Sequence, residues 1–533
     1  MNPPRESALR RLVVACISLS IGVASLGATA WGESAGLAQV PGWSKDDYAY
    51  FLHGSLSTEI VPESVARAFI RVYPEIFPTS DFSHLGMIPD PDFGWPIGIT
   101  RRTVRHLGGL TSLGVNCAGC HVTDITAPGG VTPIRLIGVI SVFDSEAFFG
   151  SLIGAGFRTG DPANMKKFLA AWLSVNDPAG GEKAQEAFAK QWQEQEEKIK
   201  SAMAEEAKSF TTGSLLEIAP NDLKLDADAL SHGVDLAALS KSMLALFHNM
   251  RAALHLPDQP PEKAPQASGP GRDDAFGVLS IMLFGLPQPH ASAKYGILWN
   301  LDQRHWVHWD GNTQSPLGRN LLASLGLGAP LIGRRSDVDL AMVKRHTNLS
   351  EKIRPPAYPF PIDRGAAHRG EAIYAANCAS CHTGEENDSR LHSPQKIGTD
   401  PMRATLFTPE QAARFDKFFA DFETPGYQAP SEPPIRSTGQ YWAPSLGGVW
   451  ARSPYLHNGS ARTLQELLSP PAARAKKFHR GSRVFDSKAV GLTDEGPYLL
   501  DTAASGDSNS GHEYGTQLSD QEKQDLIEYL KTL

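Results

Sequence analysis

Hydrophobic and polar residues recur with a helical period in several long stretches of the chain. Within residues 162–256, EKAQEAFAKQWQEQEEKIKSAMAEEAKSF is highly charged and predicts a solvated helix, whereas LAALSKSMLALFHNMRAALHL is more apolar and predicts a helix packed on a core. The C-terminal stretch LSDQEKQDLIEYLKTL opens with a capping box, Ser519 and Glu522, and gathers its leucines and Ile527 on one face. These patterns predict a mainly helical protein.

Turn-forming residues fill the segments between these helices. Gly (49) and Pro (39) make up about a sixth of the 533 residues, which favours extensive loops over a regular bundle. The stretch PDQPPEKAPQASGPG at 257–271 predicts a turn or linker, and residues 295–330 are dense in aromatic and turn residues. A chain of this length accommodates two or three domains.

The first thirty residues have the pattern of an export signal. Arg5, Arg10 and Arg11 precede the apolar run LVVACISLSIGVASLG, and ATA at 28–30 offers a small-residue cleavage site. This predicts a signal peptide over 1–30 and a periplasmic or secreted protein with no stable membrane insertion after cleavage. An uncleaved membrane anchor is the alternative, because the run is only slightly short for a span.

Net charge narrows the range of partners. The whole chain carries a formal charge of −8, and removing residues 1–30 takes away three Arg and one Glu, which leaves about −10. A general nucleic-acid-binding protein would carry a basic surface. We therefore expect no nucleic-acid partner.

The cysteines follow a distinctive arrangement. Of five cysteines, Cys16 belongs to the signal, and the other four form two CxxC pairs that are each followed directly by His: NCAGCH at 116–121 and NCASCH at 377–382. Such a motif belongs to half a zinc site, a redox disulfide or a haem anchor. In the haem anchor the two thiols add to the haem vinyl groups, and the histidine becomes the proximal iron ligand.

Two of these alternatives fit poorly. A zinc site needs four ligands, and each Cys2His set lacks an obvious fourth. A redox disulfide does not require the histidine. The sequence therefore predicts two covalently bound haem c groups, with attachment and ligation by Cys117, Cys120 and His121, and by Cys378, Cys381 and His382.

The stretch before the second motif supports this prediction. In DRGAAHRGEAIYAANCASCH, Gly370, Tyr374 and Cys378 fall on one stripe of a helix. It resembles the N-terminal helix of class I c-type cytochromes, which packs against the C-terminal helix. We expect two class I cytochrome c-like domains: residues 31–335, with a helical insertion at about 162–268, and residues 336–533.

Several segments carry a wider resemblance. These are GSLSTEIVP, WVHWDGNTQSPLGRN, IGTDPMRA, SLGGVWARSPYLHNGSARTLQELLSPP and GDSNSGHEYG. With the two CxxCH motifs, they resemble the dihaem cytochrome c peroxidase superfamily, and most closely the branch that contains the bacterial rubber oxygenases. Some members of the superfamily hold calcium between the haem domains, and the sequence does not decide that point.

The resemblance implies a division of labour between the haems. His121 would hold the first haem alone, leaving its other face free for a small oxidant. The second haem would be held by His382 and by His512 of GHEYG, with Met402 as the rival sixth ligand. A tryptophan between the haems is typical, and Trp309 matches that motif best, followed by Trp306.

The sequence also departs from the superfamily pattern. Peroxidases of the superfamily place an acid downstream of the Trp-Asp-Gly motif, but residues 311–335 contain no Glu or Asp. Rubber oxygenases use an aromatic residue in an apolar pocket, and Phe276 in GPGRDDAFG is the candidate for that position. Arg272, Arg319 and Arg403 are candidate partners for haem propionates.

Two classes of function follow. The first is an oxidoreductase that takes a small-molecule oxidant, peroxide or dioxygen, accepts electrons from a periplasmic redox partner, and acts on peroxide itself or on an apolar organic substrate. The second is an electron-transfer cytochrome without its own substrate. Length favours the enzyme, because a two-haem carrier needs roughly 200 residues.

Overall fold

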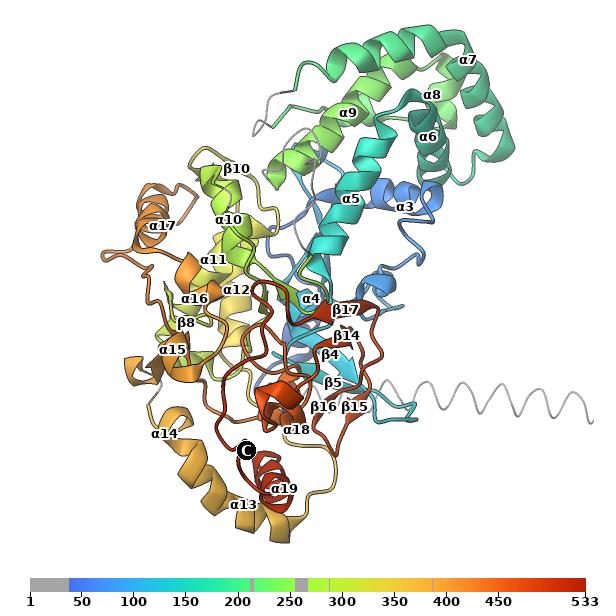
Figure 1. Cartoon of the computed structure of the whole chain (residues 1–533). Helices are drawn as coiled ribbons and strands as arrows, with labels where there is room; N and C mark the ends of the chain where they lie inside the picture. The colour runs from blue at the N-terminus through green and yellow to red at the C-terminus, as the bar shows by residue number, and fades with distance from the viewer. Residues whose placement is uncertain (1–37, 211–214, 255–266, 287, 386) are drawn as a thin grey trace, which may run out of the picture.

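The computed structural model describes residues 38–533 except 211–214, 255–266, 287 and 386. Helices dominate and are joined by long loops and by ladders of two or three short strands (Figure 1). The prediction of a mainly helical chain with extensive loops is confirmed. The predicted signal peptide lies outside the described residues. Within the described ranges, no helix is both long and apolar enough to cross a membrane.

A small antiparallel sheet with strand order β1-β3-β2 organises the first part of the chain. Ile99 pairs with Val115 and Thr103 with Thr111, so that β3 leads directly into α4, the helix of the first CxxCH motif. β4 continues from α4 and pairs with β5. The elements are α2 (Lys45–His53), β1 (Val61–Pro62), α3 (Glu63–Val72), β2 (Ile99–Thr103), β3 (Thr111–Val115), α4 (Cys117–His121), β4 (Val122–Ile125) and β5 (Ile134–Ile137).

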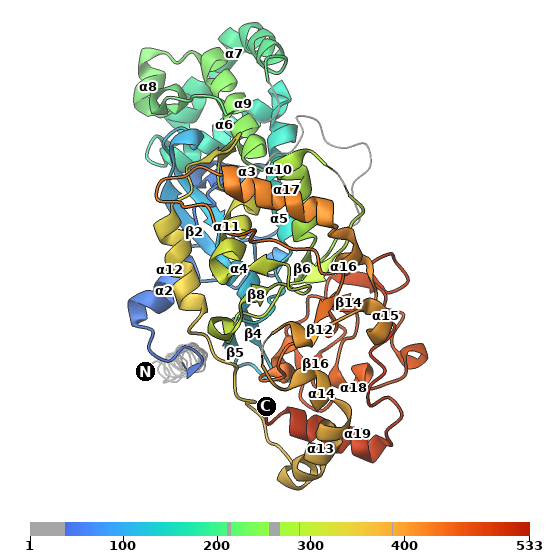
Figure 2. The same ribbon diagram turned by 90° about the vertical axis from the view of Figure 1, so that its left-hand side faces the viewer.

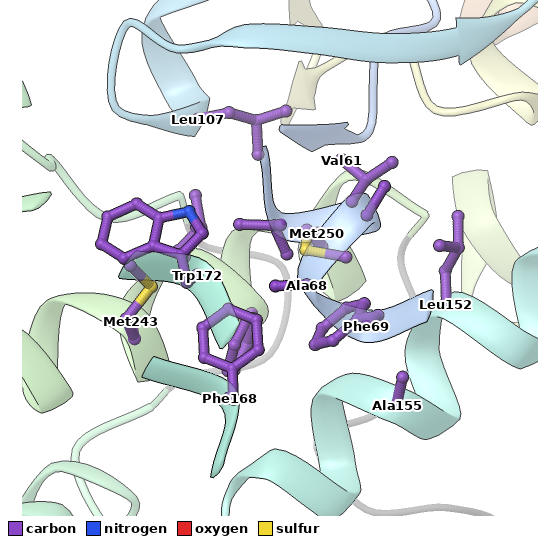
Figure 3. Close-up of a cluster of buried hydrophobic side chains, with 14 of the residues drawn as sticks. Val61, Ala68, Phe69, Leu107, Leu152, Ala155, Phe168, Trp172, Met243 and Met250 are labelled. Atoms are coloured by element: carbon purple, nitrogen blue, oxygen red, sulfur yellow. The ribbon is translucent and has the colours of Figure 1, made fainter. Parts of the chain in front are cut away.

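Five helices form a lobe at one end of the molecule, at the top of Figure 1. Its core gathers Phe69 of α3 with Phe168, Trp172, Met243 and Met250 (Figure 3). The helices are α5 (Ser145–Thr159), α6 (Pro162–Asn176), α7 (Gly181–Glu206), α8 (Ala227–His232) and α9 (Leu236–Ala253).

Of the two helix predictions within this lobe, one is confirmed and the other is wrong in part. α9 is buried along nearly its whole length, as its apolar pattern predicts. The prediction that the charged helix is solvated is wrong for one stripe of α7, because Phe188, Trp192 and Ile199 are buried where α7 packs along α9. Their i, i+4 and i+11 spacing interrupts the charged residues and places them on one face.

Another hydrophobic cluster joins the middle of the chain to its C-terminal part. Phe276 and Leu279 of α10, Leu322 of α11, and Phe415 and Phe419 of α17 belong to this cluster. The elements of the middle part are β6 (Arg272–Asp273), α10 (Ala275–Phe284), β7 (Ala293–Lys294), β8 (Trp306–Val307), β9 (Thr313–Gln314), α11 (Pro316–Gly326), β10 (Leu331–Ile332), β11 (Arg335–Ser336) and α12 (Leu340–Ser350).

The first and last helices of the C-terminal part pack closely against each other, as expected from the class I cytochrome resemblance. α13 and α19 lie side by side in Figures 1 and 2. A Cβ on Gly370 would lie 2.1 Å from the Asp525 carbonyl oxygen, so the glycine allows the backbones to touch. The ring centroids of Tyr374 and Tyr529 lie 5.2 Å apart, and the predicted capping box of Ser519 opens α19.

Short elements connect these two helices, and the predicted domain boundary at 335–336 falls inside β11. α12, just beyond that boundary, packs on α11 and α2 of the preceding part. The remaining elements are α13 (Arg364–Asn377), α14 (Ala379–His382), β12 (Leu391–His392), α15 (Pro394–Ile397), α16 (Met402–Leu406), α17 (Pro409–Asp421), β13 (Tyr441–Trp442), α18 (Leu464–Leu467), β14 (Lys477–Arg480), β15 (Phe485–Asp486), β16 (Gly491–Leu492), β17 (Tyr498–Asp501) and α19 (Asp520–Leu530).

Candidate functional site

Both CxxCH motifs line one internal cavity of about 460 Å³. Its wall contains all four cysteines of the motifs, together with His121, His382 and His512. Most of the remaining wall is apolar and comes from α10, α11, α18 and α19 and from the loops around β13. Residues that lie far apart in the sequence therefore meet around a single, largely apolar space.

The first motif is a short helix held by its N-cap. Asn116 is buried, accepts a hydrogen bond from the Ala118 N–H, and donates to the carbonyls of Phe51 and Gly54. Gly98 passes so close to this helix that a Cβ on it would lie 2.3 Å from the Gly119 Cα. The backbone before β2 thus fixes the motif against the cavity.

His121 is kept neutral by its surroundings. Burial lowers the pKa of His121 to about 3, and the charge of Arg319 acts in the same direction. Its Nδ1 faces the backbone of Gly296, which weakly opposes the shift, but no hydrogen bond of good geometry reaches that nitrogen from the described residues. The nearest ring is Tyr295, whose centroid lies 6.2 Å away. A neutral imidazole in an apolar wall is in the form that binds a metal.

His382, the histidine of the second motif, has a defined orientation. Its Nδ1 lies 2.7 Å from the Pro444 carbonyl oxygen, which can only accept a hydrogen bond, so the proton resides on Nδ1. Burial lowers the pKa of His382 to about 4. Nε2 therefore keeps its free lone pair, as in metal-binding histidines whose other nitrogen is bonded to a carbonyl.

His512 lies opposite His382 across the cavity. Their ring centroids are 6.4 Å apart. Metal–imidazole bonds are about 2 Å long, so two rings on opposite sides of one metal ion have centroids roughly 6 Å apart. Burial lowers the pKa of His512 to about 4. Met402, the rival ligand, is absent from the cavity wall, and its sulfur contacts the Ser505 hydroxyl.

A buried arginine that sequence reasoning missed shapes the His512 loop. Arg474 donates to the carbonyls of Asn509, Gly511 and His512, while the His512 N–H donates to the Ile397 carbonyl. These bonds hold His512 at φ +47, which a non-glycine residue rarely adopts. The residues that lead up to Arg474, SPPAAR, carry no local signal for this contact. The three carbonyls of the His512 loop lie more than thirty residues further along the chain.

The cysteines are free thiols rather than a disulfide pair. Burial raises the pKa of Cys117 and of Cys378 to about 11 and raises the pKa of Cys120. In the described parts of the chain, no three His, Cys, Asp or Glu side chains converge as ligands of a metal ion. The residues around each motif therefore do not form the tetrahedral set of a zinc site.

This set of residues fits covalently bound haem c. The cavity is apolar, the paired thiols and the proximal histidine of each motif line it, and His382 faces a second imidazole at the separation that one iron requires. Arg319 places a partly buried guanidinium in the same wall, where an anionic propionate would meet a positive charge.

The other arginines predicted to contact propionates differ in position. Arg403 lines the cavity but is paired with Asp310 at 2.9 Å. Arg272 lies outside the cavity wall, and its guanidinium is bonded to Asp507.

The predicted relay and pocket aromatics also reach the cavity. Trp309 lines it, and its Nε1–H donates to the Lys294 carbonyl at 2.8 Å. Trp306, the second choice, does not line it and stacks under Arg436. Phe276 is buried in the wall.

Phe276 contacts His308, a half-buried histidine in the cavity wall that the sequence does not distinguish from His305. Their ring centroids lie 5.1 Å apart, and Arg403 covers the Phe276 ring at 4.8 Å. Burial lowers the pKa of His308 to about 3. His305, three residues earlier, instead contacts Gln314 near the surface.

Comparisons with known families place cytochrome c-like sequence in the C-terminal part of the chain. A family described as RoxA-like, cytochrome c-like, matches residues 439–479, and one described as cytochrome C oxidase, cbb3-type, subunit III, matches residues 365–416. The second match contains NCASCH, and the first contains Pro444 and His457. Cytochrome c domains hold covalently bound haem c, so the chain is of the haem c redox class.

Two related proteins match a longer part of the chain than the family models do. Two uncharacterised proteins of Sinorhizobium fredii are 34% and 29% identical over 44% and 56% of this chain. The matches cover 63% and 65% of those proteins, just under two thirds of their lengths. A structure of hydrazine synthase from Kuenenia stuttgartiensis matches 46% of this chain and 73% of its own at 18% identity and a TM-score of 0.26, too distant to inform the fold.

Proposed function

We propose that the chain is an exported dihaem c-type cytochrome oxidoreductase. One haem, at His121, activates peroxide or dioxygen, and the other, at His382, stores and relays electrons. The observation that carries this proposal is the asymmetry between the motifs: His382 faces His512 with ring centroids 6.4 Å apart, whereas the ring nearest to His121 is Tyr295. The hydroxyl of Tyr295 is occupied by the Phe143 carbonyl and Ser145.

The chain's own residues support different roles at the two motifs. Pro444 and Arg474 fix His382 and His512, which favours a closed, electron-storing site. At the first motif, Cys117 packs against the apolar cluster of α10 and α11 and lines the cavity, which favours a small apolar or uncharged molecule there. Haem c at these motifs supplies iron that accepts electrons from a donor and passes them to an oxidant.

Electron exchange between the two sites needs a route through the protein. Trp309 is the candidate relay, because it lines the shared cavity and its carbonyl accepts a hydrogen bond from the N–H of Trp442, another wall residue. The RoxA-like match at 439–479 covers Trp442 and supports the rubber-oxygenase branch, in which an apolar organic substrate is oxidised. The electron donor would be a periplasmic redox partner, neutral or cationic given the acidic chain.

An electron-transfer cytochrome without its own substrate is the second candidate. It requires a sixth ligand at the first motif as well. His308 is the observation in its favour, because it is a half-buried histidine in the cavity wall whose pKa is lowered by burial to about 3.

Optical and EPR spectra of the purified holoprotein, oxidised and reduced, with and without cyanide or carbon monoxide, separate the two candidates. We expect two haems per chain, one low-spin and one that is high-spin or binds the added ligand. Two low-spin haems that bind neither ligand in any redox state would identify the protein as an electron-transfer cytochrome without its own substrate.

A pair of variants tests the ligand of the second haem in the same spectra. His512→Ala should convert the low-spin haem to a high-spin, ligand-binding one, because no other imidazole faces His382 in the described parts of the chain. Met402→Leu is the matched control and should leave the spectrum unchanged, because Met402 is absent from the cavity wall. The opposite result, with Met402→Leu altering the spectrum and His512→Ala not, would assign the thioether as ligand.

A further inference from the structure

A chain of hydrogen bonds connects the partly exposed His290 with the cavity. His290 Nε2 lies 2.8 Å from Ser292 Oγ and 3.0 Å from Ser268 Oγ. The Ser292 hydroxyl donates to Ser268 Oγ at 2.9 Å, and the Ser268 hydroxyl donates to Glu146 Oε1 at 2.6 Å. Both serines are buried, the His290 side chain is 20% exposed, and Glu146 lines the cavity.

These bonds have a consistent direction. With His290 Nε2–H as the first donor, each group donates to the next one inward until the Glu146 carboxylate accepts. Hydroxyl groups donate and accept at once, so they pass a proton by exchanging one O–H bond for another. Asp274, whose Oδ2 lies 3.7 Å from His290 Nδ1, is placed to stabilise the imidazolium while it carries the proton.

A second carboxyl group lines the cavity that this chain reaches. Asp273 lines the same cavity as Glu146. Burial raises the pKa of Asp273 to about 7, the charges of Glu146 and Asp274 add to the shift, and Arg403 opposes it. The other titratable groups that interact with these carboxyls are Cys120, Tyr295 and Asp144. Cys120 belongs to the first CxxCH motif and lines the same cavity as Asp273.

We infer that His290, Ser292, Ser268 and Glu146 form a proton path from the surface to the cavity at the first motif, with Asp273 as the inner acid. The inference rests on the proposed function and narrows its oxidant. Reduction of hydrogen peroxide to two water molecules consumes two protons along with two electrons from the redox partner. Insertion of both atoms of dioxygen into an organic substrate consumes neither. A built proton path therefore favours a reaction that reduces peroxide.

The path also supplies the acidic groups that are missing from the sequence downstream of Trp309. Residues 311–335 contain no acidic side chain. Asp273 and Glu146 reach the cavity instead from β6 and α5, which precede that segment in the chain. General acid catalysis depends on a protonated group near the reacting atoms and not on its position in the sequence.

Ligand binding to the holoprotein tests the path without using turnover. Hydrogen cyanide must lose its proton before it binds ferric haem, whereas carbon monoxide binds ferrous haem without proton transfer. In Glu146→Gln, the amide oxygen can still accept from Ser268, but the side chain cannot take up a proton. We expect cyanide association at pH 7 to slow by about tenfold or more in Glu146→Gln and in Asp273→Asn. Carbon monoxide association should stay the same.

Glu197→Gln is the matched control, because Glu197 is 88% exposed on α7. Unchanged cyanide association in both Glu146→Gln and Asp273→Asn, relative to this control, would overturn the path. Equal slowing of cyanide and carbon monoxide would also overturn it, because it indicates a blocked cavity. A wild-type protein that binds neither ligand would overturn the proposed function itself, and the path with it.

Infrared spectroscopy gives a readout that does not depend on added ligands. A protonated, buried carboxyl absorbs at a frequency distinct from that of a carboxylate. We expect a carboxylic-acid band at pH 5 that is lost at pH 9 and is missing in Asp273→Asn. A wild-type spectrum without this band, or an unchanged band in Asp273→Asn, would remove Asp273 as the inner acid.

Discussion

Single side chains in the cavity wall owe their protonation states to burial. His121, His382, His512 and His308 are all held neutral, because removal from water disfavours the imidazolium. The same burial favours the neutral form of Asp273. Burial thus keeps these four imidazoles in the form that binds a metal, and it favours the protonated form of the Asp273 carboxyl.

Asp273 should make the stability of the protein depend on pH. Its pKa is about 7 in the folded state and 3.8 for an unperturbed side chain, so between pH 4 and pH 7 the folded state binds the extra proton. Stability therefore falls as pH rises through this window and levels off above pH 7. Asp273→Asn removes this dependence, and its melting temperature relative to wild type should rise from pH 4 to pH 7.

Thermal unfolding of both proteins across that range measures the difference directly. Asp501→Asn provides the comparison, because Asp501 lies in an exposed pair with Lys477. If the wild-type and Asp273→Asn curves run parallel with pH, Asp273 ionises normally in the folded state.

At the scale of elements, the contact between α13 and α19 supports the second CxxCH motif. Gly370 lets the backbones meet, and Arg369 forms a bidentate pair with Asp525 across the same contact. α13 continues into α14, so any shift of α13 moves Cys378 and His382 together. The position of the motif therefore depends on a helix from the far end of the chain.

Gly370→Ala should destabilise this contact, because its Cβ would lie 2.1 Å from the Asp525 carbonyl oxygen. We expect a loss of about 1–3 kcal/mol or more from overpacking, together with reduced haem content at the second motif. Gly365→Ala on the same helix is the control. Its nearest neighbouring atom is 3.4 Å away, and alanine favours a helix over glycine by up to about 1 kcal/mol.

Chemical denaturation and the pyridine haemochrome spectrum of both variants provide the measurement. Equal stability of the two variants would show that α19 moves aside without cost.

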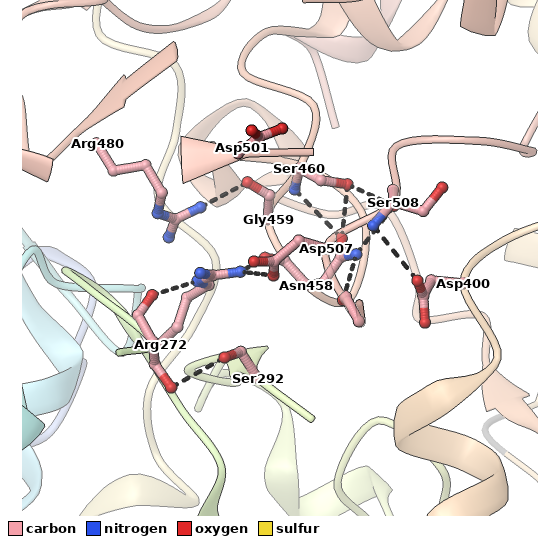
Figure 4. A network of polar contacts seen from close by, with 12 residues as sticks. Arg272, Ser292, Asp400, Asn458, Gly459, Ser460, Arg480, Asp501, Asp507 and Ser508 are labelled. Carbon is pink, nitrogen blue, oxygen red and sulfur yellow. Dashed lines mark hydrogen bonds and ion pairs between the residues drawn. The ribbon is translucent and has the colours of Figure 1, made fainter. Parts of the chain in front are cut away.

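At the scale of the whole molecule, buried polar contacts tie the middle of the chain to its C-terminal loops. Arg272 is bonded to Asp507 and to the Asn458 carbonyl, and Asn458 donates to the carbonyls of Gly506 and Ser508 (Figure 4). The Arg272 and Asp507 side chains are 0% and 3% exposed. This network joins β6 to two loops of the C-terminal part.

Asp507→Ala should destabilise the protein by about 3–5 kcal/mol, because it leaves the Arg272 charge buried without its partner. Asp501→Ala, which breaks the exposed pair with Lys477, should cost about 1 kcal/mol or less. Urea unfolding of the two variants compares them. A loss at Asp507 as small as that at Asp501 would mean that Arg272 finds another partner or reaches water.

Features encoded by short local patterns could be predicted, and those made by distant contacts could not. The helix before Cys378, the capping box at Ser519 and the two CxxCH motifs are all visible within fewer than twenty residues. Pro444 and Arg474 act through carbonyl contacts with residues far along the chain, for which no motif exists. The buried stripe of α7 carries a local signal, the spacing of its aromatic residues, but the surrounding charges obscure it.

The shared cavity also dictates an order of events during biogenesis. Its wall includes Leu56 from the start of the described chain and Leu530 from the end, so it closes only after the last segment has been synthesised. By then the thiols line the cavity and are only partly exposed, which restricts the access of an attachment enzyme. We therefore expect the cofactor to be joined to Cys117 and Cys120 before the cavity has closed, so that haem attachment competes in time with folding.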